Sequence, residues 1–204
     1  MKRLLCILAV ALVSLPGFAE FRWGPTIGVN GSSLYWKQKL ASTRYSVGPM
    51  AGIAGELMIP GIGFGIDMGV RYQMNGAKVN FGERPIWSNP PDNMGNEQVW
   101  IHTIQIPVNL KFKWTRLDGL ERIVAPFAFA GPVFTFNVAT NDIPVIETPE
   151  GTVDIQVGAG AELWERLQIS AGYYFGVSYQ VRTLKLENYS ARPQGWFVNA
   201  AWFF

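Results

Sequence analysis

Few side chains in this 204-residue chain could carry out chemistry at a shared site. His102 is the only histidine and Cys6 the only cysteine, so a metal site built from several imidazole or thiolate ligands is excluded. Loop carboxylates at Asp142, Glu147 and Glu150 could meet a calcium ion, but their spacing does not match a calcium-binding loop. We therefore expect no metal, no cofactor and no catalytic residues.

The charged pair Asp67 and Arg71 lies inside the stretch "GFGIDMGVRYQMN" at 63–75. On a helix these two residues would form an ion pair worth about 0.2–0.5 kcal/mol, whereas each of the three glycines would cost about 1 kcal/mol. At a period of two, the even positions from Phe64 to Met74 are all apolar, and the odd positions are small, amide or charged. The stretch is predicted to be a strand whose polar face carries both charges.

The same period predicts eight strands and no helix of useful length. We expect them near Arg22–Ser32, Gly48–Ile59, Gly61–Asn75, Val99–Trp114, Ile123–Asn137, Thr152–Leu163, Leu167–Ser178 and Gln194–Phe204.

The connections between these strands alternate in length. The first, third, fifth and seventh are long and polar, whereas the second, fourth and sixth are short, as in "PG" and "WER". Short periplasmic turns and longer external loops are typical of outer-membrane barrels, and an even number of strands closes the sheet without an edge. The prediction is all-β: an eight-stranded antiparallel up-and-down transmembrane β-barrel.

Side-chain size indicates which face of the barrel looks outward. An eight-stranded barrel has an interior just wide enough for its own side chains, and large residues such as Trp100 and Trp114 share one face of their strand. The opposite faces carry small residues such as Gly158 and Gly160. We expect the apolar face to contact lipid. The alternative is a soluble, lipocalin-like barrel with its apolar face around a lipophilic ligand.

Residues 1–19, "MKRLLCILAVALVSLPGFA", are typical of a secretory signal peptide, which leaves 20–204 as an outer membrane β-barrel domain. The alternative, a membrane anchor, is disfavoured because the apolar run from Leu4 to Leu15 is shorter than the roughly 20 residues that a spanning helix needs. The net charge of +2 includes Lys2 and Arg3. The exported chain is then nearly neutral, and nucleic acid is not an expected partner.

Aromatic residues are expected at both membrane boundaries. Trp100 and Trp114 are fourteen residues apart on one face, or roughly 35 Å along the membrane normal for a strand tilted by about 40°. Trp196, Trp202 and Phe204 repeat this arrangement in the last strand, although they could equally be ordinary strand aromatics. The terminal "NAAWFF" resembles the signal by which bacterial outer-membrane barrels are recognised for insertion.

Strand parity also predicts a charged network inside the barrel, where charges must pair or be solvated. The expected members are Glu56, Asp67, Arg71, Lys111, Lys113, Asp154 and Glu162. We hypothesise that their ion pairs and hydrogen bonds plug the lumen. The alternative is that some of them lie at the wet rims and have no function.

Parity places His102 on the lipid-facing side. Some eight-stranded barrel enzymes that trim lipid A keep a His and Ser pair on that face, but here Ile104 stands two positions on and no serine lies beside it. We therefore predict that the protein is not an enzyme.

Four strand motifs resemble one known family: "VGPMAGIAGEL", "IQIPVNLKFKW", "PFAFAGPVFTFNV" and "VGAGAEL". They are similar to the PorT family of outer membrane β-barrel proteins of Bacteroidota, which are OmpA/OmpX-like eight-stranded barrels. The resemblance implies an outer-membrane location and barrel construction at the matching positions. The family takes its name from a member needed for type IX secretion, and this chain differs from that member in its loops.

Three function classes follow from these expectations. The first is a monomeric structural or interaction protein, too narrow for a general porin, that contacts outer-membrane lipid and other envelope proteins. The second is an accessory component of a type IX-like secretion system, and the third is the soluble lipophile-binding barrel. The external loop Gly76–Gln98, with Pro85, Trp87, Pro90, Pro91 and the adjacent Trp100, is the candidate partner contact. A variable loop that binds nothing is the alternative.

Overall fold

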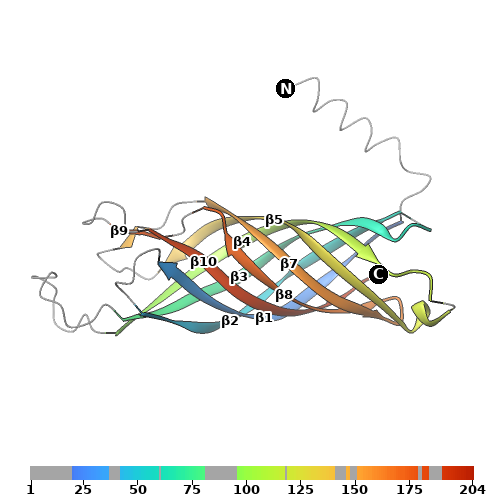
Figure 1. The fold of residues 1–204 in the computed structure, drawn as a ribbon, viewed down its shortest axis with the longest axis horizontal. Helices are drawn as coiled ribbons and strands as arrows, with labels where there is room; N and C mark the ends of the chain where they lie inside the picture. The colour runs from blue at the N-terminus through green and yellow to red at the C-terminus, as the bar shows by residue number, and fades with distance from the viewer. Residues whose placement is uncertain are drawn as a thin grey trace, which may run out of the picture.

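The computed structural model is a single β-barrel (Figure 1). It describes residues 20–36, 42–59, 61–80, 96–117, 119–140, 146–147, 151–178, 181–183 and 190–204. Eight long strands form the wall: β1 (Glu20–Trp36), β2 (Ser42–Met58), β3 (Phe64–Asn80), β4 (Asn96–Lys113), β5 (Val124–Thr140), β7 (Gly151–Leu163), β8 (Leu167–Gly176) and β10 (Ser190–Trp202). Two short strands, β6 (Ile146–Glu147) and β9 (Val181–Thr183), pair beyond the wall.

The eight wall strands pair antiparallel in chain order, and β1 pairs with β10 to close the sheet. The register of the closing pair runs from Thr26 opposite Ala201 to Trp36 opposite Ala191. No helix among the described residues is long and apolar enough to cross a membrane. The predicted fold, an eight-stranded antiparallel up-and-down barrel, is confirmed.

The three short connections and the C-terminus lie at one end of the barrel, on the right in Figure 1. We call this the short-turn end and the opposite one the loop end. Gly63 in the β2–β3 turn has φ +74°, and a Cβ there would lie 2.2 Å from the carbonyl oxygen of Lys113, so only glycine fits. In the β7–β8 turn, Trp164 and Glu165 both have positive φ, the backbone conformation of a type I′ hairpin turn.

The strands extend further towards the loop end than the sequence pattern predicts. The third strand ends at Asn80 where the pattern predicts Asn75, and the second begins at Ser42 where the pattern predicts Gly48. These extra residues mix polar side chains such as Arg44 with apolar ones such as Ala77. Backbone pairing continues there, but the register of β2 and β3 shifts between Tyr45 and Met50, so the period of two is interrupted.

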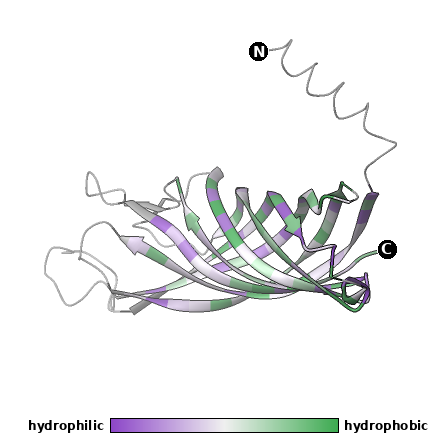
Figure 2. Ribbon diagram, turned by 45° about the vertical axis from the view of Figure 1, so that its right-hand side comes forward, coloured by the Kyte–Doolittle hydropathy of each residue, from purple (hydrophilic) through white to green (hydrophobic). Residues whose placement is uncertain are grey.

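The two faces of the wall follow the predicted parity. Along β3, Arg71, Gln73 and Asn75 are buried inside, whereas Val70 and Tyr72 are exposed on the outside. Figure 2 shows hydrophobic and hydrophilic bands succeeding one another along the strands. A lipocalin-like barrel would have the reverse arrangement.

Candidate functional site

The lumen of the barrel is filled by side chains, and its most highly charged part lies near the short-turn end. Glu56 on β2 is completely buried there. Its Oε1 accepts hydrogen bonds from Arg22 Nη2 at 2.6 Å and from Lys113 Nζ at 2.7 Å, and its Oε2 accepts one from Lys111 Nζ. One carboxylate on β2 thus holds three cations contributed by β1 and β4.

A second carboxylate and an amide complete this charged cluster. Glu162 on β7 accepts from Arg22 and Lys113, each at 2.7 Å. Gln168 on β8 donates to Glu162 at 2.6 Å and to Glu56 at 2.8 Å, and its Oε1 accepts from Lys111 Nζ at 2.6 Å. We call these six residues the Glu56 cluster: Arg22, Glu56, Lys111, Lys113, Glu162 and Gln168. The cluster ties five strands together across the lumen.

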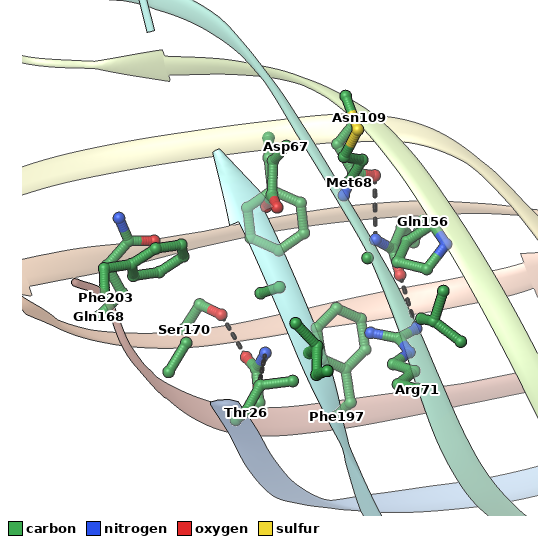
Figure 3. A pocket seen from close by; sticks show the side chains of 18 of the residues that line it. Thr26, Asp67, Met68, Arg71, Asn109, Gln156, Gln168, Ser170, Phe197 and Phe203 are labelled. Carbon is green, nitrogen blue, oxygen red and sulfur yellow. Dashed lines mark hydrogen bonds between the residues drawn. The ribbon is translucent and has the colours of Figure 1, made fainter. Parts of the chain in front are cut away.

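Arg71 forms a second layer towards the middle of the barrel. Its Nε donates to Gln105 at 2.8 Å and its Nη2 to Gln156 at 2.9 Å, and its guanidinium lies 5.2 Å from the ring centre of Phe197. The amide of Gln156 donates in turn to Asn109 at 2.9 Å. Figure 3 shows this chain from Arg71 through Gln156 to Asn109. The guanidinium is thus bonded to neutral amides.

The two remaining predicted acids, Asp67 and Asp154, also face the lumen. Among the described residues, no ion pair includes Asp67, Arg71 or Asp154. Asp154 Oδ2 accepts from Thr135 Oγ1 at 2.9 Å. Asp67 and Arg71 line a cavity of about 50 Å³ (Figure 3), the size of a few water molecules and too small for an organic ligand.

Hydrogen-bonded amides fill the lumen nearer the loop end. Asn75 Oδ1 accepts from Gln73 at 2.7 Å, from Asn30 at 3.1 Å and from the Tyr174 hydroxyl at 3.3 Å. These side chains come from β1, β3 and β8. The lumen is therefore bridged at three successive levels.

Buried aromatic rings occupy part of the lumen, which the sequence analysis did not predict for β5 and β10. Phe127, Phe129, Phe197 and Tyr174 form a buried cluster with Met50. They pack against bare backbone: a Cβ on Gly160 would lie 2.6 Å from Phe127, one on Gly158 2.5 Å from Phe129, and one on Gly172 2.6 Å from Phe197. Glycines on β7 and β8 thus make room for phenylalanines within a narrow interior.

The charges in the described part of the lumen balance. The cations are Arg22, Arg71, Lys111 and Lys113, and the anions are Glu56, Asp67, Asp154 and Glu162, four of each. Sequence reasoning named seven of the eight and missed Arg22. Parity along β1 was the signal that could have identified it, since Arg22 shares the inward-facing positions of Thr26 and Asn30.

The outer wall carries the predicted boundary aromatics. Trp114, Trp196, Trp202 and Phe204 are exposed on it, and Trp100 is half-buried over Gly76. His102 also faces outward, where its Nδ1 lies 2.6 Å from the hydroxyl of Tyr72. No serine takes part in this contact.

No metal centre is found in the described residues, where no three His, Cys, Asp or Glu side chains are arranged to hold an ion. The loop acids Asp142 and Glu150 lie outside the described residues, as do Pro85, Trp87, Pro90 and Pro91 of the candidate contact loop.

The comparisons with known proteins agree with this geometry. The family model described as outer membrane protein beta-barrel domain matches residues 14–187. The chain belongs to this outer membrane β-barrel family. Membership indicates an outer-membrane location. No curated protein matches the sequence.

Solved structures share the fold at low sequence identity. Outer membrane protein OprG from Pseudomonas aeruginosa aligns with a TM-score of 0.50 and 10% identity over 92% of this chain and 95% of that one. Neisserial surface protein A gives a TM-score of 0.49 and 12% identity over 91% and 99%. Ail, the attachment invasion locus protein of Yersinia pestis, gives 0.45 and 11% over 91% and 99%. At these identities the similarity concerns the fold alone.

Proposed function

We propose that this protein is a non-conducting outer-membrane barrel that acts through its wall and its external loops as a structural or interaction protein. The observation that carries the proposal is the filled lumen. Hydrogen bonds cross it at three levels, and the Glu56 cluster alone joins five strands. A solute would have to break buried, charge-assisted contacts at each level to pass.

The opening at the short-turn end does not change this conclusion. A vestibule of about 390 Å³ at the short-turn end is lined by Arg22, Lys113 and Glu162, so it stops at the Glu56 cluster. The cavity beyond it is only about 50 Å³. General diffusion of nutrients, as through a porin, needs a continuous aqueous channel, which barrels of 16–18 strands provide.

The outer wall supports a non-enzymatic role. His102 is bonded to Tyr72 and is surrounded by apolar residues such as Ile104. The proposal therefore assigns no catalytic residue and no cofactor.

A PorT-like accessory role in protein secretion is the second candidate. It rests on the four strand motifs quoted above, which resemble that family of Bacteroidota, and on a signal peptide at 1–19 that would export the chain. In this role the monomeric barrel would be embedded in outer-membrane lipid and would support other envelope proteins. Its loop at 76–98 would make the contact. Deleting residues 84–93 should then reduce crosslinking to envelope proteins while the barrel remains heat-modifiable.

Single-channel recording in planar bilayers tests the main proposal. We expect no stepwise conductance from the wild-type barrel under conditions in which a trimeric porin gives clear steps. Glu56→Gln, which loosens the cluster, should raise the frequency of brief openings, whereas the exposed Glu165→Gln should not. A large, salt-dependent wild-type conductance would contradict the proposal.

A further inference from the structure

The vestibule at the short-turn end has the size of a ligand pocket, and the proposed function does not use it. Its volume of about 390 Å³ lies in the lower part of the range for small-molecule pockets, about 300–1,000 Å³, and the mouths of β-barrels are common places for them. The Glu56 cluster closes its inner end. Short turns of such barrels face the periplasm, so a periplasmic ligand can enter the vestibule without passing through the barrel.

The floor of the vestibule carries an excess of positive charge. In the Glu56 cluster the three cations Arg22, Lys111 and Lys113 face two carboxylates. The other two lumen acids, Asp67 and Asp154, do not line the vestibule. The charge balance at the floor therefore favours an anionic group on a ligand.

Hydrogen-bond donors remain at this floor. Arg22 Nη2 donates to Glu56 and Glu162, and its Nη1 donates to the carbonyl oxygen of Glu165 in the β7–β8 turn at 2.6 Å. The bond to the turn shows that Nη1 points towards the opening, and these bonds use only three of the five guanidinium N–H groups. Lys113, which also lines the vestibule, uses two of its three N–H groups in the cluster.

Between the floor and the opening the walls are apolar. They include the buried side chains of Met58, Ala125 and Phe203. A ligand that reaches the floor must therefore have an apolar segment behind its anionic group.

The rim of the vestibule is acidic. Its charged side chains are three acids and one base: Glu20, Glu121, Glu165 and Arg166. None of the ion pairs among the described residues includes these four side chains. The rim therefore favours a cationic group on the ligand, opposite in charge to the group at the floor.

The spacing between floor and rim sets the length of the ligand. Glu20 and Arg22 lie on the same face of β1, and Glu20 is directly opposite the wall residue Met58. Glu20 is two residues nearer the opening, or about 7 Å along the strand. Two extended residues of a peptide also span about 7 Å, whereas the ammonium and carboxylate of a single amino acid are attached to the same carbon.

We propose that the vestibule binds short zwitterionic peptides, and dipeptides in particular, from the periplasm. The C-terminal carboxylate accepts from Arg22 and Lys113, and the N-terminal ammonium lies beside Glu20. An apolar side chain between them packs against Met58 and Phe203. The order of the groups supports this ligand, because its anion, apolar segment and cation match the floor, walls and rim in turn.

Titration by saturation-transfer difference NMR tests the proposal on the folded barrel in detergent, with the dipeptide alanyl-leucine as the probe. The C-terminal amide of this dipeptide should bind at least about tenfold more weakly, because it loses the charge-assisted bonds at the floor. The N-acetylated dipeptide, which has no ammonium, should bind about threefold more weakly, since the contact at the exposed rim is weaker. Equal binding of alanyl-leucine and its amide, or no saturation transfer to alanyl-leucine, would overturn the proposal.

Glu20→Gln tests the placement of the ammonium. The variant should weaken binding of alanyl-leucine about threefold and leave binding of the N-acetylated dipeptide unchanged, because that ligand has no ammonium to lose. Glu147→Gln in β6, at the loop end, removes the same charge and should change neither affinity. If Glu20→Gln weakens both ligands equally, the ammonium does not lie beside Glu20 and the proposed orientation is wrong. The comparison of the three ligands on the wild-type barrel decides the proposal even if the variant does not fold.

Discussion

Glu56 illustrates how a single side chain can organise the inside of a narrow barrel. It is buried, and it is the only carboxylate among the described residues within ion-pair distance of three cations. Charge-assisted bonds from Arg22, Lys111 and Lys113 offset the cost of removing it from water. The stability of the short-turn end therefore depends on the balance of charge around this residue.

Glu56→Gln is expected to destabilise the barrel by about 3–5 kcal/mol, because it leaves the buried Lys111 and Lys113 and the half-buried Arg22 with one fewer anion. The urea midpoint of unfolding in lipid vesicles measures this effect. Adding Lys111→Met restores neutrality and should recover part of the loss, whereas Glu165→Gln, on the exposed turn, should change little. A single variant as stable as the wild type would show that the cluster contributes nothing to stability.

The sequence was enough to predict which charged residues face the lumen, but not which of them form ion pairs or hydrogen bonds with one another. Parity in β2, β3, β4 and β7 placed seven charged residues inside, since alternation is a property of one strand. Which of these charged residues form ion pairs depends on the register and shear of the closed barrel. Neither can be derived from the sequence of one strand alone. Asp67 and Arg71, four residues apart on one strand, therefore both face inward without forming an ion pair with each other.

At the scale of elements, β7 and β8 carry inward-facing glycines, and aromatic residues pack against their bare backbone. The phenylalanine rings lie over their direct register partners on the adjacent strands: Phe127 over Gly160, Phe129 over Gly158 and Phe197 over Gly172. A Cβ on Gly160 would also lie 2.3 Å from the carbonyl oxygen of Ile169, so the obstacle includes backbone that cannot easily move. The large residues of β5 and β10 are therefore matched by small residues on the neighbouring strands β7 and β8.

Gly160→Ala should destabilise the barrel by about 1–3 kcal/mol or reduce its assembly, because the added methyl overpacks the lumen. Gly151→Ala on the same strand is the control, since its nearest contact would be an ordinary 3.7 Å. The fraction that shifts in mobility on boiling reports assembly for both variants. Equal fractions for the two variants would argue against tight packing at Gly160.

Sequence patterns predicted some strands better than others for a physical reason. From Phe64 to Met74 one face of β3 is wholly apolar and the other is not. The pattern therefore showed both that this segment is a strand and which of its faces points out of the barrel. Along β5 both faces are apolar, with Phe127 and Phe129 inside and Phe134 and Phe136 outside. Hydropathy alone therefore could not place the interior phenylalanines.

At the scale of the whole molecule, the barrel has a polar, charge-balanced interior and an apolar exterior, the reverse of a water-soluble domain. The apolar face of β3 runs from the exposed Phe64 near the short-turn end to Gly76, which Trp100 covers, with the exposed Val70 midway. If this surface is the one in contact with lipid, the cost of placing a charge on it must depend on depth.

Val70→Arg is therefore expected to destabilise the folded barrel by about 2–4 kcal/mol, since it places a guanidinium near the bilayer midplane. Val138→Arg is the matched variant: Val138 is equally apolar and exposed but lies near the loop end of β5, where the expected cost is about 0–1 kcal/mol. Denaturant titration of both variants in lipid vesicles and in detergent measures the difference. The difference in destabilisation between the two variants should be large in a bilayer. It should be smaller in detergent micelles, because micelles rearrange around a charge. Equal costs in vesicles would mean that the cost of a charge on the apolar exterior does not depend on membrane depth. The assignment of this face to lipid, on which the predicted boundary tryptophans depend, would then be wrong.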